Sequence, residues 1–485
     1  MNKHRILRSI GKILLTEVLL MIPSLLVSFI YGEGDSIYFL VTMIPAAVIG
    51  FILSHVKVAE KRMGSRDAYY IVALAWIVIS VIGAFPLYFS GCFDSYWGAL
   101  FEMVSGITTT GASVLAKPEL LPHGVLFWRS FTHWIGGMGV LVFVLMLMPM
   151  ENDNSMHLVR AEVPGPTASK LVPKMKTTAM ILYGIYAAMT VLLLVLLLLG
   201  GMPLFDALCI SFGTAGTGGF ATSSAGIAGY KSAYMEVVIG IFMMLFSINF
   251  NVYFFLLLRK VKEAFNTEEV KWYIGIVAFS TIAIACNTCA GMENIGKAAR
   301  DAFFQVTSII STTGFATVDY NLWPEFSKHL LVLLMIIGAC SGSTGGGLKV
   351  SRVIILVKSF LAEIRHIASP KTVSIVRLNK KGVDKETLIG TRNYMAAYFI
   401  IICLITLIIA IDGFDLTTNL TAVLSCFNNI GPGLNAVGPV ENFGGYSDWV
   451  QVLLSFVMLT GRLEIFPMFI LLSRSSHHRI GKRGI

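Results

Sequence analysis

The sequence predicts an all-α polytopic membrane protein, in which two N-terminal transmembrane helices precede four helix–pore helix–loop–helix (M1-P-M2) repeats around one pore. Three observations predict this fold. Apolar runs of about 20 residues recur along the chain, and 55% of its 485 residues are hydrophobic while only 13% are charged. Basic residues gather in alternate loops. A short glycine-centred polar motif occurs four times, each time after a half-length apolar segment and before a full-length one.

The two N-terminal spans are expected at 13–30 and 38–55, joined by a short acidic turn at 32–35. A span needs roughly 20 residues, because a helix rises about 1.5 Å per residue across roughly 30 Å of hydrocarbon. The first span lacks the small-residue cleavage pattern of a signal peptide, so we expect it to be retained.

Four similar units follow, each with a long helix, a short helix, the glycine hairpin and a second long helix. The first long helices are expected near 69–89, 177–199, 270–289 and 394–411, and the second near 125–148, 233–258, 328–361 and 449–472. The expected domain boundaries are 1–66 for the N-terminal pair and 67–176, 177–270, 271–385 and 386–485 for the repeats.

The short helix of each unit is expected to have about 12 residues, which is roughly 18 Å or half a bilayer. Small polar or acidic residues in three of the four units predict an N-cap at the outer surface. These positions are 98–99, 206–207, 301–302 and 418–419. The C-terminal end of each short helix then points toward the bilayer centre, where its partial negative charge favours a cation.

The formal net charge of +9 comes from basic loops rather than from a nucleic-acid surface. Lys and Arg concentrate at 3–12, 57–66, 160–176, 259–271, 352–392 and 474–483. This positive-inside pattern predicts that both termini are cytoplasmic. We expect no nucleic-acid partner, while a cytoplasmic acidic partner stays open.

The four polar motifs predict a ring of backbone carbonyls for a dehydrated cation. Non-helical backbone at membrane depth is tolerated only where it is buried or lines water, and glycine permits the angles that turn successive carbonyls toward an axis. A wide carbonyl cage suits potassium, and the lack of acidic residues in the motifs disfavours a divalent ion. The expected ion-binding residues are Thr109, Thr110, Gly111, Thr217, Gly218, Gly219, Thr312, Thr313, Gly314, Asn429, Ile430 and Gly431.

A glycine-rich stretch at 338–347 interrupts the second long helix of the third unit. Glycine costs about 1 kcal/mol per residue in a helix, so we expect two half-helices joined by a loop at membrane depth. A loop below the carbonyl ring would obstruct a pore and move aside; the alternative is a packing kink. The expected gate residues are Gly338, Gly342, Ser343, Thr344, Gly345, Gly346, Gly347 and, from the fourth unit, Arg462.

Arg462 lies too deep in an apolar span to reach water easily, and a charge there usually faces a cavity or a partner. One interpretation places it beside the ion path below the ring, where it repels bound cations and eases their exit. The other is a structural ion pair with Glu464 or another acid, such as Glu102. Lys349 is either a second intramembrane charge or a residue near the inner surface.

At these motifs the chain resembles the TrkH family of bacterial potassium uptake proteins, within the superfamily that includes KtrB and the plant HKT transporters. The resemblance covers the whole chain and rests on the segments 108–112, 219–220, 314–315, 342–349, 428–433 and 461–466. Two extra N-terminal helices favour TrkH over KtrB.

The resemblance implies filter glycines at Gly111, Gly219, Gly314 and Gly431, a gating loop at 338–347 and a pore arginine at Arg462. It implies a lipid-embedded homodimer in the bacterial cytoplasmic membrane, with one pore per subunit, docked on a cytoplasmic ring of nucleotide-binding TrkA-type subunits. The transported ion would be potassium, and no organic cofactor is expected. In the superfamily, serine at the first filter glycine goes with sodium transport, so Gly111 favours potassium.

The second motif reads Ala-Gly-Thr-Gly-Gly at 215–219, with more glycine than the usual Ala-Ile-Gly-Gly type. The extra glycine would loosen this quadrant and blur potassium selectivity over sodium or rubidium. We therefore expect a channel-like potassium permease, with a less selective Na⁺/K⁺ transporter as one alternative.

A second alternative is a symporter of K⁺ with H⁺ or Na⁺, which normally uses a titratable group near the midplane. The one candidate for such a group beside the ring is Glu102. An intramembrane enzyme is not expected, because no Ser-His, Asp-Asp or HExxH constellation occurs within the spans.

Overall fold

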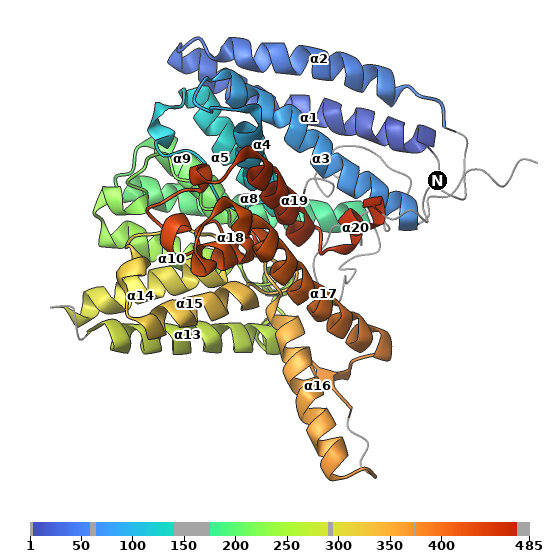
Figure 1. Cartoon of the computed structure of the whole chain (residues 1–485), viewed down its shortest axis with the longest axis vertical. Coiled ribbons are helices and arrows are strands. Elements are labelled where there is room, and N and C mark those ends of the chain that lie inside the picture. Colours follow the sequence, from blue (N-terminus) through green and yellow to red (C-terminus); the bar gives the residue numbers. More distant parts are fainter. Residues whose placement is uncertain (1–2, 59–64, 140–174, 290–293, 372–374, 473–485) are drawn as a thin grey trace, which may run out of the picture.

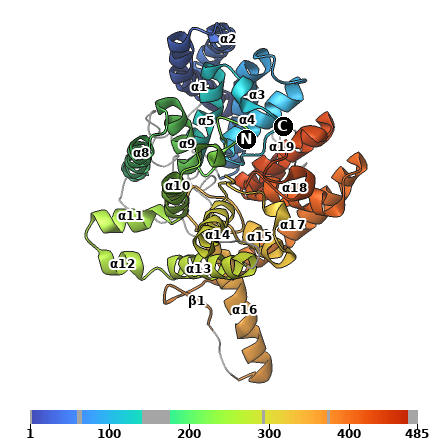
Figure 2. The same cartoon turned by 90° about the vertical axis from the view of Figure 1, so that its left-hand side faces the viewer.

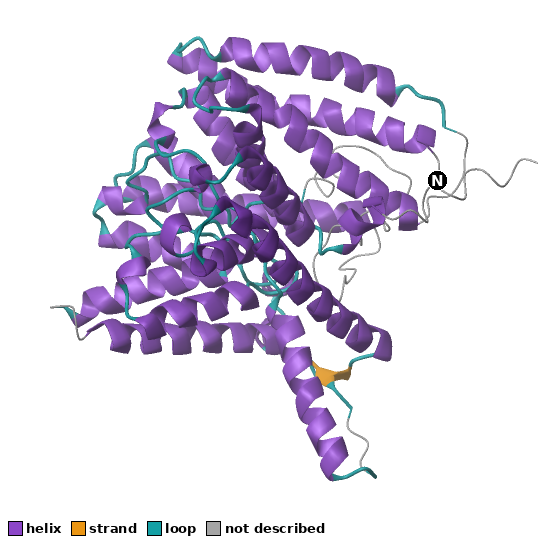
Figure 3. Cartoon of the chain, in the orientation of Figure 1, coloured by secondary structure: helices purple, strands orange, loops and turns teal. Residues whose placement is uncertain are grey.

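The computed structural model describes residues 3–58, 65–139, 175–289, 294–371 and 375–472. Within these ranges the chain is mostly helical, with one short antiparallel ladder of strands β1 (Arg377–Leu378) and β2 (Lys381–Gly382) beside helix α16 (Val350–Ala368) (Figure 3). Six described helices are long and apolar enough to span a membrane, and a seventh span counts one bent pair of helices. The expectation of an all-α multi-pass membrane protein is confirmed.

Helices α1 (Lys3–Tyr31) and α2 (Ser36–Ser54) form an antiparallel hairpin on the outside of the molecule, next to α3 (Figure 1). The two helices approach each other closely at Gly11 and Gly50. A Cβ atom on Gly11 would lie 2.4 Å from the backbone nitrogen of Ser54, and one on Gly50 would lie 3.1 Å from the carbonyl oxygen of Gly11. Small residues at such crossings let two membrane helices pack backbone to backbone.

Four groups of helices follow, and Figure 2 shows that they succeed one another around the molecule in chain order. The first group contains α3 (Ser65–Phe89), α4 (Tyr96–Ile107) and α5 (His123–Gly137); the second contains α8 (Met175–Leu199), α9 (Leu204–Ala215), α10 (Ala233–Phe246) and α11 (Phe250–Leu257). The third contains α13 (Glu268–Thr288), α14 (Ile295–Ile310), α15 (Glu325–Ile337) and α16 (Val350–Ala368); the fourth contains α17 (Lys385–Ile409), α18 (Leu416–Asn428), α19 (Asp448–Arg462) and α20 (Phe466–Leu472). The short helix α12 (Val261–Phe265) connects the second group to the third.

The short helices α4, α9, α14 and α18 occupy the predicted half-length segments, but their starts differ from the expectation. Their N-caps are Ser95, Pro203, Asn294 and Asp415, so the positions predicted as caps lie inside the helices. Two of these helices begin earlier than predicted because a cap lies one turn before the predicted position. The side chains of Ser95 and Asp415 accept from the backbone amides of Gly98 and Thr418. Hydrogen bonding from Thr418 lowers the pKa of Asp415 below its usual value.

The second long helices depart from the prediction more strongly, because three of them are broken. The break between α15 and α16 was expected from the glycine-rich stretch. The continuous spans predicted at 233–258 and 449–472 are wrong: α10 and α11 are bent by 91°, and α19 ends at Arg462 before α20 begins at Phe466. In the first group α5 ends at Gly137, and the rest of the predicted helix 125–148 beyond residue 139 lies outside the described residues.

Gly11→Leu tests the packing of the N-terminal hairpin. We expect it to lower the apparent melting temperature of the detergent-purified protein, because overpacking a close contact typically costs about 1–3 kcal/mol. Gly184→Leu in α8 is the matched control, since a Cβ atom at Gly184 meets no atom within 4 Å. Equal melting temperatures for the two variants would contradict the described crossing of α1 and α2.

Candidate functional site: a ring of glycine turns above an intramembrane loop

The four motif glycines lie next to one another in a closed ring. A Cβ atom placed on each glycine would lie against the carbonyl oxygen of the residue directly before the next glycine in the ring. The added Cβ atom would lie 1.9 Å from the carbonyl oxygen of Gly218 at Gly111, 2.0 Å from that of Thr313 at Gly219, 1.9 Å from that of Ile430 at Gly314, and 3.0 Å from that of Thr110 at Gly431. The sequence brings four distant segments to one centre, and the first three positions have no room for a side chain.

The backbone of the four turns repeats the same conformation. Each glycine has a positive φ, and so does the residue two positions before it: Thr109, Thr217, Thr312 and Asn429. In every turn, the amide directly before the glycine donates to a carbonyl in the last part of the short helix, at 2.8 Å for Thr110 to Ser105, 2.8 Å for Gly218 to Gly213, 2.9 Å for Thr313 to Ser308 and 3.0 Å for Ile430 to Ser425. The small residues six positions before each glycine are therefore the acceptors that anchor the turns.

The side chains of the turns differ between the four groups. The hydroxyls of Thr110 and Thr313 contact the hydroxyls of Thr108 and Ser311, each at 2.7 Å, and thus brace the turn from behind. Asn429 donates from Nδ2 to Thr110 Oγ1 at 2.9 Å, which links the fourth turn to the first. Within the described residues, the buried oxygens Thr109 Oγ1 and Asn429 Oδ1 have no hydrogen-bond partner.

A cavity of about 270 Å³ opens on one side of the ring and is lined by all four motif glycines. Residues that follow each glycine form its walls, among them Ser113, Ala221, Thr317 and Pro432. The carboxylates of Asp319 and Glu441 also line it. The cavity therefore ends at the ring, and its wall carries two acidic side chains.

The glycine-rich loop lies directly against the other side of the turns. The amide of Gly346 donates to Thr312 Oγ1 at 2.6 Å. A Cβ atom on Gly346 would lie 2.3 Å from the carbonyl oxygen of Asn428, and one on Gly345 would lie 2.7 Å from that of Ser311. The predicted break is thus an intramembrane loop seated under the ends of α14 and α18, rather than a kink between two crossing helices.

The ends of the broken second helices converge on this loop. From the second group, the carbonyl of Phe246 accepts from Thr344 Oγ1 at 3.1 Å, and that of Ser247 accepts from the amide of Cys340 at 3.1 Å. The amide of Phe250 donates to the carbonyl of Gly342 at 3.0 Å. The bend between α10 and α11 frees these backbone groups to pair with the loop, a pairing that a straight helix does not allow.

Arg462, at the end of α19, joins the loop to the first group. It donates from Nη1 to the carbonyl of Thr344 at 2.9 Å, and from Nη2 to those of Gly136 and Gly137 at 2.6 and 3.0 Å. Glu102 pairs with Arg129 rather than with Arg462, and an ion pair of Arg462 with another acid stays a prediction. Glu464 pairs with Arg352, whose Nη2 lies 2.6 Å from Oε2.

Two further charged residues hold the loop. Lys349 is 2% exposed and donates from Nζ to the carbonyl of Gly345 inside the loop, so it is a buried charge. Glu269, on the first turn of α13, accepts at Oε1 from the amides of Ser341 and Ser351 at 2.7 and 3.0 Å. Sequence reasoning missed Glu269, because its partners are backbone amides more than seventy residues away.

Sequence reasoning also missed a buried ion pair behind the first turn. Arg129 Nε lies 2.7 Å from Glu102 Oε1, and the side chains are 2% and 0% exposed. An arginine within the apolar stretch 125–137 was the available signal, since a charge at that depth normally has a partner.

The fold defines a multi-pass membrane protein, and four glycine turns from its four groups of helices meet at one centre. A family model described as "TrkH: Cation transport protein" matches residues 38–479. The chain belongs to this TrkH family, which is a family of transport proteins and not of enzymes.

Individual relatives agree with this assignment. The Trk system potassium uptake protein TrkH of Salmonella typhimurium is 35% identical over 479 residues, which cover 97% of this chain and 98% of the relative. The protein of the same name from Escherichia coli K12 is 34% identical, with the same coverage. The crystal structure of the potassium transporter TrkH from Vibrio parahaemolyticus has a TM-score of 0.87 and 28% identity, and the match covers 98% of this chain and 99% of that one.

Thr344→Val tests how the loop is held. The variant keeps the side-chain shape but loses the hydrogen bond to Phe246, and we expect a destabilisation of about 1 kcal/mol, visible as a lower apparent melting temperature. Thr406→Val is the control, because Thr406 Oγ1 is buried without a hydrogen-bond partner in the described part of the chain. An unchanged melting temperature for Thr344→Val would contradict the described contact.

Proposed function

We propose that this protein takes up potassium across the bacterial cytoplasmic membrane through a channel-like pore, with the ring of four glycine turns as its selectivity filter. The observation that carries the proposal is the closed circuit of glycines and carbonyl oxygens. The names of the relatives support potassium as the ion. In this proposal the twelve ion-binding residues predicted from the sequence form the filter.

Electrostatics favour a monovalent cation at the ring. The helices α4, α9, α14 and α18 all end at the turns, so four partial negative charges meet there. The unpartnered oxygens of Thr109 and Asn429 add potential ligands. An inside-negative membrane voltage contributes about 2.3 kcal/mol per charge per 100 mV to uptake.

The loop at 338–347 is proposed as the gate. It rests against the turns through Gly345 and Gly346 and is tied down by Arg462, Glu269 and Phe246. Since a cation that leaves the filter toward the loop meets Gly346 and Arg462, conduction requires these groups to move.

Symport has less support, because Glu102, the carboxylate considered for it, is engaged in hydrogen bonds and an ion pair. The Glu102 oxygens accept from Ser113, Val114 and Arg129. Weaker discrimination between Na⁺ and K⁺ remains an outcome of the filter experiment below.

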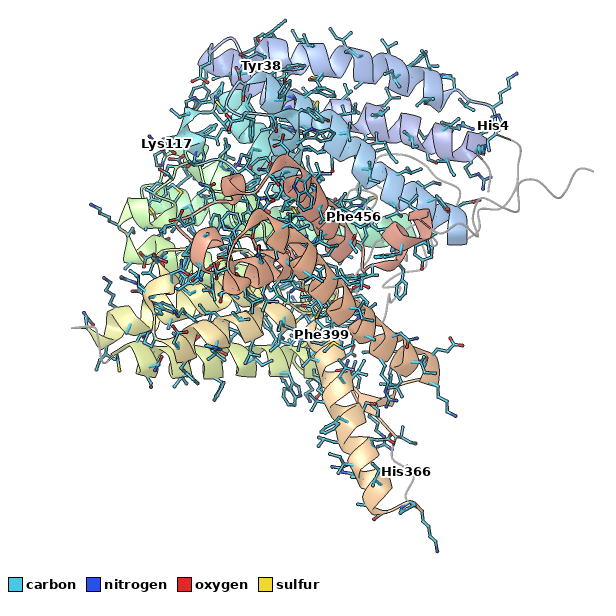
Figure 4. The ribbon with its side chains drawn as sticks, in the orientation of Figure 1. His4, Tyr38, Lys117, His366, Phe399 and Phe456 are labelled. Carbon is cyan, nitrogen blue, oxygen red and sulfur yellow. The ribbon has the colours of Figure 1, made fainter. Side chains whose placement is uncertain are left out.

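The assembly expected from the resemblance is carried forward as a proposal. The proposed assembly is a homodimer with one pore per subunit, docked on a cytoplasmic ring of nucleotide-binding TrkA-type subunits. We also propose that both termini are cytoplasmic and that the chain divides into the N-terminal pair of helices and the four repeats predicted from the sequence. In Figure 4, Lys117, which follows α4, and His4, in the first turn of α1, lie on opposite sides of the molecule, which agrees with opposite membrane faces for them. Exposed apolar residues on α16, including Phe360 and Ile364, offer a surface for a subunit or for lipid. Light scattering of the purified protein measures the oligomeric state.

Gly111→Ser tests the filter. A Cβ atom at this position meets the carbonyl of Gly218, so we expect a lower preference for K⁺ over Na⁺ in uptake by transport-deficient cells. Gly91→Ser is the control, since its Cβ atom would meet nothing within 4 Å and its φ is also positive. An unchanged cation preference in Gly111→Ser would remove the filter assignment.

Arg462→Ala tests the gate. It breaks the links from Thr344 to Gly136 and Gly137, so we expect faster K⁺ uptake per folded molecule in proteoliposomes. Arg300→Ala removes an arginine that pairs with Glu236 and makes no described contact with the loop, and it should leave uptake unchanged. If Arg462→Ala abolishes folded protein or leaves the uptake rate unaltered, Arg462 has only a structural role.

A further inference from the structure

The buried pair of Glu102 and Arg129 connects two of the four turns. Glu102 lies on α4 and Arg129 on α5, with 2.7 Å between Oε1 and Nε. A buried ion pair is a poor source of net stability, because both charges lose their hydration. The backbone positions that the pair fixes are therefore its more informative feature.

The carboxylate holds the segment that follows the first filter glycine. Glu102 Oε1 accepts from Ser113 Oγ at 2.8 Å, and Oε2 accepts from the amide of Val114 at 3.0 Å. These residues come directly after Gly111 and Ala112, so the carboxylate sets where the first turn leaves the ring.

The guanidinium reaches across to the second turn. Arg129 Nη1 donates to the carbonyl of Ala221 at 3.1 Å, and the guanidinium carbon lies 3.5 Å from the ring centroid of Phe220. Phe220 and Ala221 come directly after Gly219. One buried pair thus fixes the outer ends of two neighbouring turns relative to each other.

The other turns receive a different kind of support. The residues nine positions before the four glycines are Glu102, Ile210, Gln305 and Ala422. Gln305 donates to Thr317 Oγ1 at 3.4 Å in the third group, and Thr421 Oγ1 accepts from the amide of Leu434 at 2.9 Å in the fourth. The second group has apolar Ile210 at this position. The second turn also carries the additional glycine Gly218. Arg129, from the first group, therefore provides the polar contact that α9 lacks at Ile210.

We propose that Glu102 and Arg129 are positioning residues for cation selectivity, which hold the glycine-rich second turn at the spacing that the first turn requires. The inference rests on the proposed function of the ring as a filter. Neither side chain is assigned to the ion itself.

Removing either charge of the pair should change the K⁺ concentration for half-maximal uptake, in opposite directions for the two residues. Arg129 also lines the cavity that ends at the ring. Glu102→Gln leaves an uncompensated positive charge there, and Arg129→Gln leaves a negative one. The first should raise the K⁺ concentration for half-maximal uptake and the second should lower it, because like charges disfavour a bound cation and opposite charges favour it.

The experiment is unidirectional uptake of K⁺ and of Na⁺ by proteoliposomes containing purified full-length protein. We expect Glu102→Gln, Arg129→Gln and Arg129→Lys each to raise the Na⁺ to K⁺ uptake ratio by about tenfold, equivalent to about 1.4 kcal/mol. Arg129→Lys keeps the charge but lacks the planar fork that reaches Glu102 and Ala221 together, so its half-maximal K⁺ concentration should stay near that of the wild type. The double variant Glu102→Gln/Arg129→Gln should change the ratio no more than either single variant.

The control is Glu236→Gln, which breaks the ion pair with Arg300 at 2.7 Å between α10 and α14 and should leave the ratio unaltered. Since both ions are measured in the same vesicles, the ratio does not depend on the amount of folded protein. The proposal is overturned if the variants keep the wild-type ratio while Gly111→Ser changes it, or if none of them yields transporting protein. If Gly111→Ser also keeps the wild-type ratio, the filter assignment itself fails.

Discussion

The structure depends on the close approach of glycine Cα atoms to backbone carbonyl oxygens of the neighbouring turn. With 1.9–2.0 Å left for a Cβ atom at three of the four contacts, any larger residue forces the ring apart. Four chain segments must therefore arrive at one centre with the same backbone angles. The half-length helices, their anchoring hydrogen bonds and the small residues six positions before each glycine all serve this requirement.

A second constraint acts below the ring. Backbone groups within a membrane must pair inside the protein, and each break in a second helix exposes several of them. In the described residues, backbone groups exposed at these breaks form hydrogen bonds with the loop or with Arg462. The carbonyl of Phe246 at the end of α10 accepts from the loop, and Arg462 donates to three carbonyls of two other groups. The buried arginine thus donates several hydrogen bonds, to the loop and to the C-terminal end of α5, where the partial charge is negative. Elements of the second, third and fourth groups contact the loop, and Arg462 links it to the first group.

Much of this was predictable from the sequence, because the signals were local and repeated. The four glycine motifs, the half-length segments and the glycine-rich break each carry a backbone preference that is visible without partners. The bend after Phe246 was not, since Ser247 and Asn249 are compatible with a continuous helix and the bend is stabilised by pairing with Gly342 and Cys340. The partners of Arg462 were likewise hidden, because backbone carbonyls leave no mark in the sequence. The pairing of Glu102 with Arg129 was hidden too, because only the fold brings the two side chains together.

One polypeptide supplies all four sides of the ring, and its sides are chemically unequal. Asn429 donates to Thr110 between the fourth and first turns, while the guanidinium of Arg129 links the first group to the second turn at Ala221. In an assembly of identical subunits, a single codon change would alter every side simultaneously. Here it alters one quarter. If the ring is the proposed filter, ion preference is therefore adjustable in small asymmetric steps, and the most favourable position of a dehydrated ion need not lie on a symmetry axis.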